Sequence, residues 1–153
     1  MEKNKMQKLI EMLKRHEGEV VTNGRHVAYK CPSGYWSLGI GRNIDPNGGI
    51  GLSQEEVDML LENDIARVIK ELASEYTWFN DLDPVRADAM INLGYNLGVG
   101  SRLRGFRRAL AAMEEADYEA ASQEFLDSKW ARQVGSRAVE LTEMIRTGKY
   151  LDD

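Results

Sequence analysis

Three side chains in the first quarter of the chain have the types and the order that acid–base chemistry requires. Glu17 comes first, Cys31 follows at a turn signal, and Ser37 stands two residues before Gly39-Ile40-Gly41. A carboxyl group can donate a proton, a thiolate can act as a nucleophile, and a hydroxyl can orient water without carrying charge. The sequence therefore offers one candidate acid and two candidate groups for positioning or attack.

Glu17 ends the first predicted helix. Apolar residues recur at helical spacing over residues 4–16, and Gly18 is typical of a helix C-cap. A helix C-terminus carries partial negative charge, which disfavours a carboxylate. Glu17 is therefore expected to stay protonated near neutral pH and to serve as a general acid, the alternative being an ordinary solvated carboxylate.

A predicted hairpin places Cys31 and Ser37. Residues 27–29 and 35–38 have the composition of short strands, and the segment Cys31-Pro32-Ser33-Gly34 between them is a turn signal. A lone cysteine is more often a small buried hydrophobe, and a serine in a strand is more often a packing residue. From residue type alone, both the chemical and the structural interpretations stay open.

After residue 52 the chain is predicted to be almost entirely helical. Ser53-Gln54-Glu55-Glu56 is a capping box that begins a helix of about 20 residues, and Asp83-Pro84 begins another that ends near Gly98. Three further helices are expected, near residues 105–115, 118–128 and 137–147. Ser136 is expected to cap the last of them and Gly148 to end it.

These elements predict an α+β fold in a single domain over residues 1–153. A small sheet lobe is expected at about 17–52, a connecting helix at about 53–75 and a helical lobe at about 82–150. Two lobes joined by a helix leave a cleft, and clefts are where ligands usually bind.

Composition excludes several classes of protein. The single cysteine excludes an internal disulfide and a cysteine-based metal site, and with only two histidines no metal or other cofactor is expected. The net charge of −5 argues against a nucleic-acid partner. No apolar run is long enough to insert in a membrane, and the first residues lack the apolar centre of a secretory signal, so synthesis in the cytoplasm is expected. Without a heptad seam, a monomer is expected.

Other catalytic and ligand motifs fail on inspection. Gly39-Ile40-Gly41 lacks the third glycine of a dinucleotide loop, and no phosphate-binding Gly-Lys-Ser/Thr follows it. Residues 45–56 imitate a calcium loop, but Ile50 occupies the position that needs glycine. Residue counts alone leave a Ser-His-Asp triad open, although no Gly-x-Ser-x-Gly occurs.

The remaining constellation resembles the active-site region of phage-type lysozymes, the endolysins of glycoside hydrolase family 24. The resemblance rests on Glu17-Gly18 and on the stretch AYKCPSGYWSLGIGR from Ala28 to Arg42. It continues through Leu60–Asp64, Ala89–Gly98, Ser128–Trp130 and Arg146–Tyr150, and so covers nearly the whole chain in order. It implies a lysozyme-like α+β fold and a muramidase that cuts the β-1,4 bond between N-acetylmuramic acid and N-acetylglucosamine in bacterial peptidoglycan, causing host cell lysis.

The resemblance also implies roles for individual residues. Glu17 is then the general acid, and Cys31 and Ser37 hold the attacking water. Tyr95 and Asn96 are then expected to contact sugar, although Tyr95 could equally pack in the core. Arg137 aligns with an arginine that pairs with the catalytic glutamate, which would lower its pKa.

This sequence departs from the family pattern at three points. The spacing between Glu17 and Cys31 is longer than usual, so Glu19 is an alternative acid. Ser37 stands where threonine is usual, and Cys31 offers a thiol in place of a carboxyl group. Cys31 can therefore position water or attack the sugar itself, and two other functions stay open: a lytic transglycosylase and an inactive peptidoglycan-binding protein.

Arg42 and an arginine-rich segment are two further features of the sequence. Arg42 stands in place of a histidine and is expected to pair with Asp64, tying the sheet to the long helix. The segment from Arg102 to Arg108 holds four arginines, interpreted either as a contact for anionic wall or outer-membrane surfaces or as a solvated loop and helix start. The protein is expected to reach the wall with the help of another protein that releases it from the cytoplasm.

Overall fold

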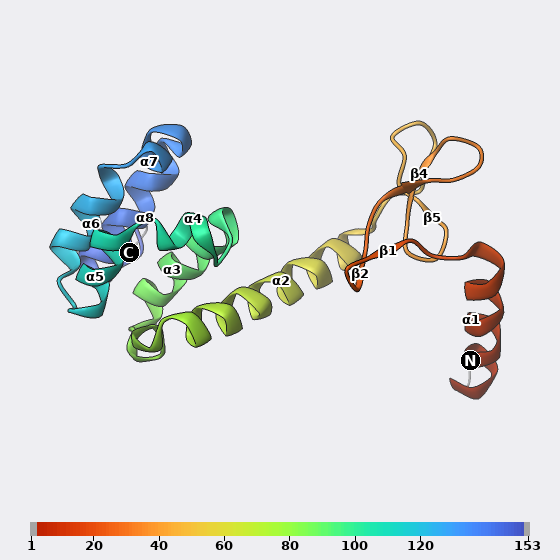
Figure 1. The fold of residues 1–153 in the computed structure, drawn as a ribbon, viewed down its shortest axis with the longest axis horizontal. Helices are drawn as coiled ribbons and strands as arrows, with labels where there is room; N and C mark the ends of the chain where they lie inside the picture. Colours follow the sequence, from red (N-terminus) through yellow and green to blue (C-terminus); the bar gives the residue numbers. More distant parts are fainter. Residues whose placement is uncertain (1–2, 152–153) are drawn as a thin grey trace. The chain divides into compact units, whose positions relative to one another are not determined.

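The computed structural model describes residues 3–151 (Figure 1). The chain divides into two compact units, one that ends at Asp58 and one that begins at Met59. The predicted order of a small sheet region, a long helix and a helical region is confirmed, and the chain has an α+β fold.

Unit 1 contains one helix and five very short strands. They are α1 (Lys3–Glu17), β1 (Val21–Thr22), β2 (Arg25–His26), β3 (Tyr29–Lys30), β4 (Trp36–Leu38) and β5 (Arg42–Asn43). Strands β1 and β2 form a hairpin, and β3, β4 and β5 form an antiparallel sheet in that order. The predicted first helix is confirmed, but the predicted strand at 27–29 begins only at Tyr29.

The turn between β3 and β4 forms where it was expected. The amide of Gly34 donates to the carbonyl oxygen of Cys31 at 2.8 Å, and the amide of Cys31 donates to the carbonyl oxygen of Tyr35 at 2.9 Å. In the sheet register Ser37 lies opposite Tyr29 on one side and opposite Asn43 on the other. Directly paired residues share a face, so these three side chains lie on the same face of the sheet.

Helix α2 (Gln54–Glu75) begins at the predicted capping box. The Ser53 hydroxyl accepts from the Glu56 amide at 3.1 Å, and the Glu56 carboxylate accepts from the Ser53 amide at 2.9 Å. The expectation that Arg42 pairs with Asp64 is wrong. Arg42 instead donates to Glu56 at 2.8 Å, because the first turn of α2 follows directly on the loop after β5, whereas Asp64 pairs with Arg67 within the helix.

Unit 2 contains the remainder of α2 and a set of mostly short helices. They are a 3-10 helix (Thr77–Asp81), α3 (Pro84–Leu97), α4 (Ser101–Arg104), α5 (Arg107–Glu114), α6 (Tyr118–Leu126), α7 (Lys129–Val134) and α8 (Ser136–Thr147). Asp83 caps α3 and Gly148 ends α8 in a left-handed conformation, as predicted. The expectation that Ser136 caps α8 is wrong: Gly135 is the N-cap, and Ser136 is already helical and makes no capping bond.

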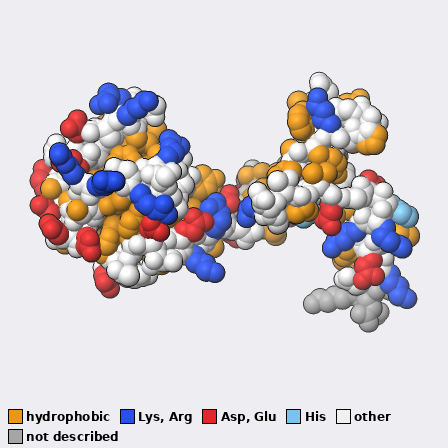
Figure 2. All heavy atoms as spheres, viewed as in Figure 1, with side chains coloured by type: hydrophobic (Ala, Val, Ile, Leu, Met, Phe, Trp, Pro, Cys, Tyr) orange, Lys and Arg blue, Asp and Glu red, His pale blue; other side chains and the backbone are white. Residues whose placement is uncertain are grey.

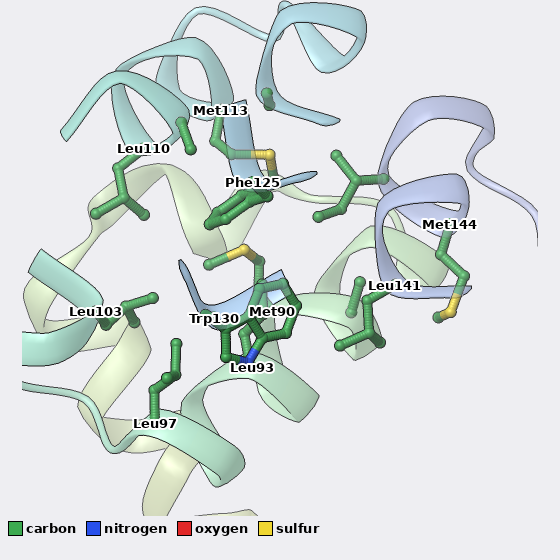
Figure 3. Packing of buried hydrophobic residues seen from close by; sticks show 14 of the residues in the cluster. Met90, Leu93, Leu97, Leu103, Leu110, Met113, Phe125, Trp130, Leu141 and Met144 are labelled. Carbon is green, nitrogen blue, oxygen red and sulfur yellow. The ribbon is translucent and has the colours of Figure 1, made fainter. Parts of the chain in front are cut away.

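The hydrophobic core of unit 2 forms where α3, α5, α6, α7 and α8 converge (Figure 3). Phe125 is fully buried, and its ring centroid lies 5.3 Å from that of Phe106, which in turn contacts Trp130 edge to face at 6.2 Å. Full burial of one such side chain stabilises the fold by roughly 1.5–3 kcal/mol. This core fixes the helices that carry Tyr95, Asn96 and Arg137.

The surface of unit 2 carries both signs of charge. On the face shown in Figure 2, Lys and Arg side chains lie among Asp and Glu side chains. The arginine-rich segment is divided between α4 and α5, and Arg104 is paired with Glu75 at 2.5 Å. These observations favour the solvated interpretation of the segment. Across residues 3–151, no helix combines the length and the apolar character needed to cross a membrane.

Candidate active site

Glu17, Cys31 and Ser37 come together in unit 1. They line one pocket with a volume of about 340 Å³. The other lining residues are Tyr29, Pro32, Ser33, Tyr35, Gly41 and Asn43. Three residues chosen for their chemistry thus share one pocket, although they come from a helix end, a turn and a strand.

Two glycines position the carboxyl group of Glu17. Gly18 follows α1 with φ +69° and donates its amide to the carbonyl oxygen of Lys14 at 3.0 Å, which ends the helix at Glu17. Gly41 also has positive φ, and a Cβ atom there would lie 2.7 Å from Oε2 of Glu17. The second glycine of Gly39-Ile40-Gly41 therefore leaves the space that the Glu17 carboxyl group occupies.

Ser37 is buried, with 3% of its surface exposed, and its side chain lies on the pocket face of β4. Within residues 3–151 its hydroxyl has no protein hydrogen-bond partner, so both its donor and its acceptor capacity are available to a ligand. Cys31 is half-buried and its thiol is free. The pocket therefore presents a carboxyl group, a hydroxyl and a thiol.

Sequence reasoning missed Tyr29 and Asn43 in this pocket. The signal that could have found them is strand alternation, because both pair directly with Ser37. The Tyr29 hydroxyl donates to the carbonyl oxygen of Gly39 at 3.4 Å. The Asn43 side-chain oxygen accepts from the amide of Asp45 at 3.0 Å.

Asp45 links β4 to the loop that follows β5. Its carboxylate accepts from the amides of Trp36 and Asn47, each at 2.9 Å, and only 8% of the residue is exposed. The bond from Trp36, followed by that from Asn47, lowers the pKa of Asp45 below its usual value. An ionised Asp45 thus holds β4 to the loop that follows β5.

A second pocket lies in unit 2 and contains two of the expected sugar-binding residues. Tyr95 and Arg137 line it, and its volume is about 490 Å³. The other lining residues are Leu61, Ile65, Ile69, Asp88, Ile91 and Asn92. Tyr95 is 47% exposed, so the alternative that it packs in the core is wrong.

Hydrogen bonds fix Arg137 and Asn96 in different ways. The Asn92 side-chain oxygen accepts from Nε and Nη2 of Arg137 at 3.0 and 2.6 Å, which holds the guanidinium at the pocket. The pairing of Arg137 with Glu17 stays a prediction, because the two residues belong to different units. Asn96 is absent from the lining of this pocket, and its side-chain oxygen accepts from Nε1 of Trp130 at 2.8 Å, so its contact with sugar also stays a prediction.

The chemistry of the unit 1 pocket is that of proton transfer and water positioning. A glutamic acid can protonate a leaving group, and a buried hydroxyl beside a thiol can hold a small nucleophile. Within the described part of the chain, no three His, Cys, Asp or Glu side chains come close enough to hold a metal ion.

Comparison with known proteins places this site in a family context. The family model described as "Phage lysozyme" matches residues 14–146. The chain is 30% identical over 141 residues to an endolysin of Acyrthosiphon pisum secondary endosymbiont phage 1, covering 92% of this chain and 89% of the relative. It is 27% identical over 164 residues to "Probable T4-type lysozyme 1" of Dictyostelium discoideum, covering 90% and 93%.

A third relative carries the same domain in a larger protein. The "Pre-baseplate central spike protein Gp5" of Enterobacteria phage T4 is 32% identical over 116 residues, which cover 71% of this chain and 19% of that protein. The family match extends over most of the chain and includes the residues that line the unit 1 pocket. The chain therefore belongs to the phage lysozyme family, a family of peptidoglycan-degrading glycoside hydrolases.

Proposed function

We propose that this protein is an endolysin with muramidase activity. It hydrolyses the β-1,4 bond between N-acetylmuramic acid and N-acetylglucosamine in bacterial peptidoglycan and so lyses the host cell. The observation that carries this proposal is that Glu17, Cys31 and Ser37 line one pocket. Family membership supports the substrate class, and the side chains support the reaction type.

Glu17 is the general acid of the proposed reaction. Its proton goes to the glycosidic oxygen as the bond from that oxygen to the anomeric carbon of N-acetylmuramic acid breaks. The departing N-acetylglucosamine leaves with a neutral hydroxyl, and positive charge develops on the muramic acid ring. The open space at Gly41 supports this role, because it lets the carboxyl group lie at the pocket surface.

Water completes the proposed reaction from positions set by Ser37 and Cys31. The water oxygen bonds to the anomeric carbon, and the water proton that is released restores the acid form of Glu17 through solvent. The unpartnered Ser37 hydroxyl suits this task, since it can accept from water or donate to it without adding charge. Cys31 is the second group facing this water.

Unit 2 supplies the proposed sugar-binding residues. The exposed ring of Tyr95 offers an apolar face on which a sugar can stack, and Arg137 offers donors held in place by Asn92. Asn96 is proposed to donate from its amide nitrogen, because its oxygen is engaged by Trp130. These side chains are proposed to contact the glycan.

Mass spectrometry of the fragments released from purified Gram-negative peptidoglycan tests this proposal. Fragments that end in reducing N-acetylmuramic acid are expected, because water is the proposed nucleophile. Fragments with anhydro ends would overturn hydrolysis in favour of a lytic transglycosylase. The absence of any fragment would overturn catalysis in favour of a peptidoglycan-binding protein.

A further inference from the structure

The amide of Asn43 is a polar group of the unit 1 pocket to which the proposed mechanism gives no role. Asn43 lies on β5 directly opposite Ser37, is half-buried and lines the pocket. Its side chain therefore lies on the same sheet face as the Ser37 hydroxyl. A group in this position can contact a ligand bound in the pocket.

The loop after β5 fixes which end of the amide is free. The side-chain oxygen accepts from the amide of Asp45 at 3.0 Å. Of the two ends of an asparagine side chain only the oxygen can accept, so this bond assigns the orientation of the amide. Gly49 encloses the same oxygen, since a Cβ atom there would lie 2.6 Å from it. The oxygen is thus engaged by the protein's own backbone.

The amide nitrogen of Asn43 is left as a donor. Among the residues that the structure describes, none accepts a hydrogen bond from it. Asp45 holds the supporting loop through its two bonds to backbone amides, so the donor is held in place before any ligand arrives. The Tyr29 hydroxyl, on the same sheet face, donates instead to the carbonyl oxygen of Gly39.

We propose that Asn43 is a substrate-binding residue that donates from Nδ2 to an acceptor oxygen of an N-acetylated amino sugar bound in the unit 1 pocket. This inference rests on the proposed function for its ligand class. Hydroxyl and acetamido oxygens are the acceptors such a sugar offers, and a neutral amide donates to them without altering the charge beside Glu17. Asn43 thereby contributes binding, while Glu17 contributes the proton.

The variant Asn43→Asp distinguishes the role of the amide nitrogen from that of the amide oxygen. Aspartate keeps an oxygen for the amide of Asp45, so the loop geometry is retained, but it has no N–H donor. We expect KM to rise about 3- to 10-fold with a smaller change in kcat, in the range of one lost hydrogen bond, and an unchanged thermal midpoint. Unchanged kinetics would reduce Asn43 to a support for the loop and overturn the inference.

Asn47→Asp is the matched control. It introduces the same charge change four residues further along the chain, in the loop that follows β5, but Asn47 is exposed and is absent from the pocket lining. Its kinetics should stay within about 2-fold of the parent. An equal rise in KM for both variants would attribute the effect to charge and would also overturn the inference.

Asn43→Ala tests the folding contribution separately. It removes both donor and acceptor, so it should raise KM and also speed hydrogen exchange at the Asp45 amide, whereas Asn43→Asp should raise KM alone. Rapid exchange in both variants would show that the loop, and not the donor, sets the affinity. That result would count against a direct contact with substrate.

Equilibrium binding distinguishes this inference from the proposed function. Soluble uncleaved glycan chains of peptidoglycan are titrated calorimetrically into Glu17→Gln protein with and without Asn43→Asp. Weaker binding in the double variant, by about the same factor as the KM change, supports the contact whether or not the parent protein yields reducing ends. Equal binding by both proteins, or no binding by either, overturns it.

Discussion

The two units of this molecule are built by different interactions. Every buried hydrophobic side chain in the described chain lies at or beyond Val68, in unit 2. Among the described residues of unit 1 whose burial is known, the buried ones are Ser37 and Asp45, both polar. Unit 1 is held by backbone hydrogen bonds, a capping box and an Asp45 carboxylate, whereas unit 2 is held by close packing.

This difference predicts that the residues that set the reaction rate and the residues that set the free energy of unfolding lie in different units. No residue that lines the unit 1 pocket belongs to the hydrophobic core, so replacing the candidate catalytic residues should change reaction rates with little effect on unfolding. Residues in the unit 2 core are buried hydrophobic side chains with no proposed role in the reaction, so replacing them should lower the free energy of unfolding.

The largest effect is expected for Glu17→Gln. Glutamine keeps the size of the side chain but has no acidic proton, so kcat should fall by about 10²- to 10⁴-fold, the usual contribution of a general acid. Because Glu17 is exposed, the free energy of unfolding should change by less than about 0.5 kcal/mol. Release of reducing ends and urea unfolding measure the two quantities on the same preparation.

Glu19→Gln is the control for this experiment. Glu19 is the alternative acid two residues later, but its Oε2 lies 3.5 Å from Nε2 of His26, and it does not line the pocket. Its kcat should match that of the parent. A larger loss for Glu19→Gln than for Glu17→Gln would transfer the role of acid to Glu19.

Phe125→Ala should show the opposite behaviour. Phe125 is fully buried against the ring of Phe106, so its removal should lower the free energy of unfolding by about 3–5 kcal/mol. Leu126→Ala, at the neighbouring position that is 38% exposed, should cost less than about 1 kcal/mol. Urea unfolding measures both, and a similar loss for the two would contradict a core centred on Phe125.

The sequence predicted the parts of the fold that local chemistry determines. The capping box at Ser53, the cap at Asp83 and the glycine end at Gly148 each depend on a few neighbouring residues, and each forms as predicted. The turn after Cys31 does so for the same reason. Resemblance to a known family supplied the proposed roles of residues that no local pattern distinguishes.

The features that the sequence did not predict depend on tertiary contacts or on elements too short to show a pattern. Helices α4 and α7 have four and six residues, too short for a periodic apolar pattern to identify. Arg42 could pair with several acidic residues, and the path of the loop after β5 selects Glu56. Asn43 lines the pocket because the sheet register places it opposite Ser37. Strands of two residues are too short for the sequence to define that register.

A smaller effect is expected from helix capping in unit 2. The Ser128 hydroxyl accepts from the amide of Ala131 at 3.1 Å at the start of α7, so Ser128→Ala should lower the free energy of unfolding by about 1 kcal/mol. Ser136→Ala should have almost no effect, because Gly135 is the N-cap of α8. Urea unfolding distinguishes them, and equal losses would restore a capping role for Ser136.

The smallest effect is expected at the ion pair that joins the sheet of unit 1 to α2. The bond from Arg42, followed by that from the Ser53 amide, lowers the pKa of Glu56 from 4.5 to about 2. The folded value is below the unfolded one, so ionised Glu56 stabilises the fold above about pH 4.5, and this contribution is lost as the pH falls toward 2.

Glu56→Gln should therefore make the thermal midpoint fall less steeply over that pH interval. The side chains of Arg42 and Glu56 are 36% and 39% exposed, so solvent screening keeps the change far below what the pKa shift alone implies. Asp45, whose pKa is also lowered, titrates in the parent and in the variant and cancels in the comparison. If the two slopes coincide, backbone bonds such as those to Asp45, and not the ion pair, hold unit 1 together in acid.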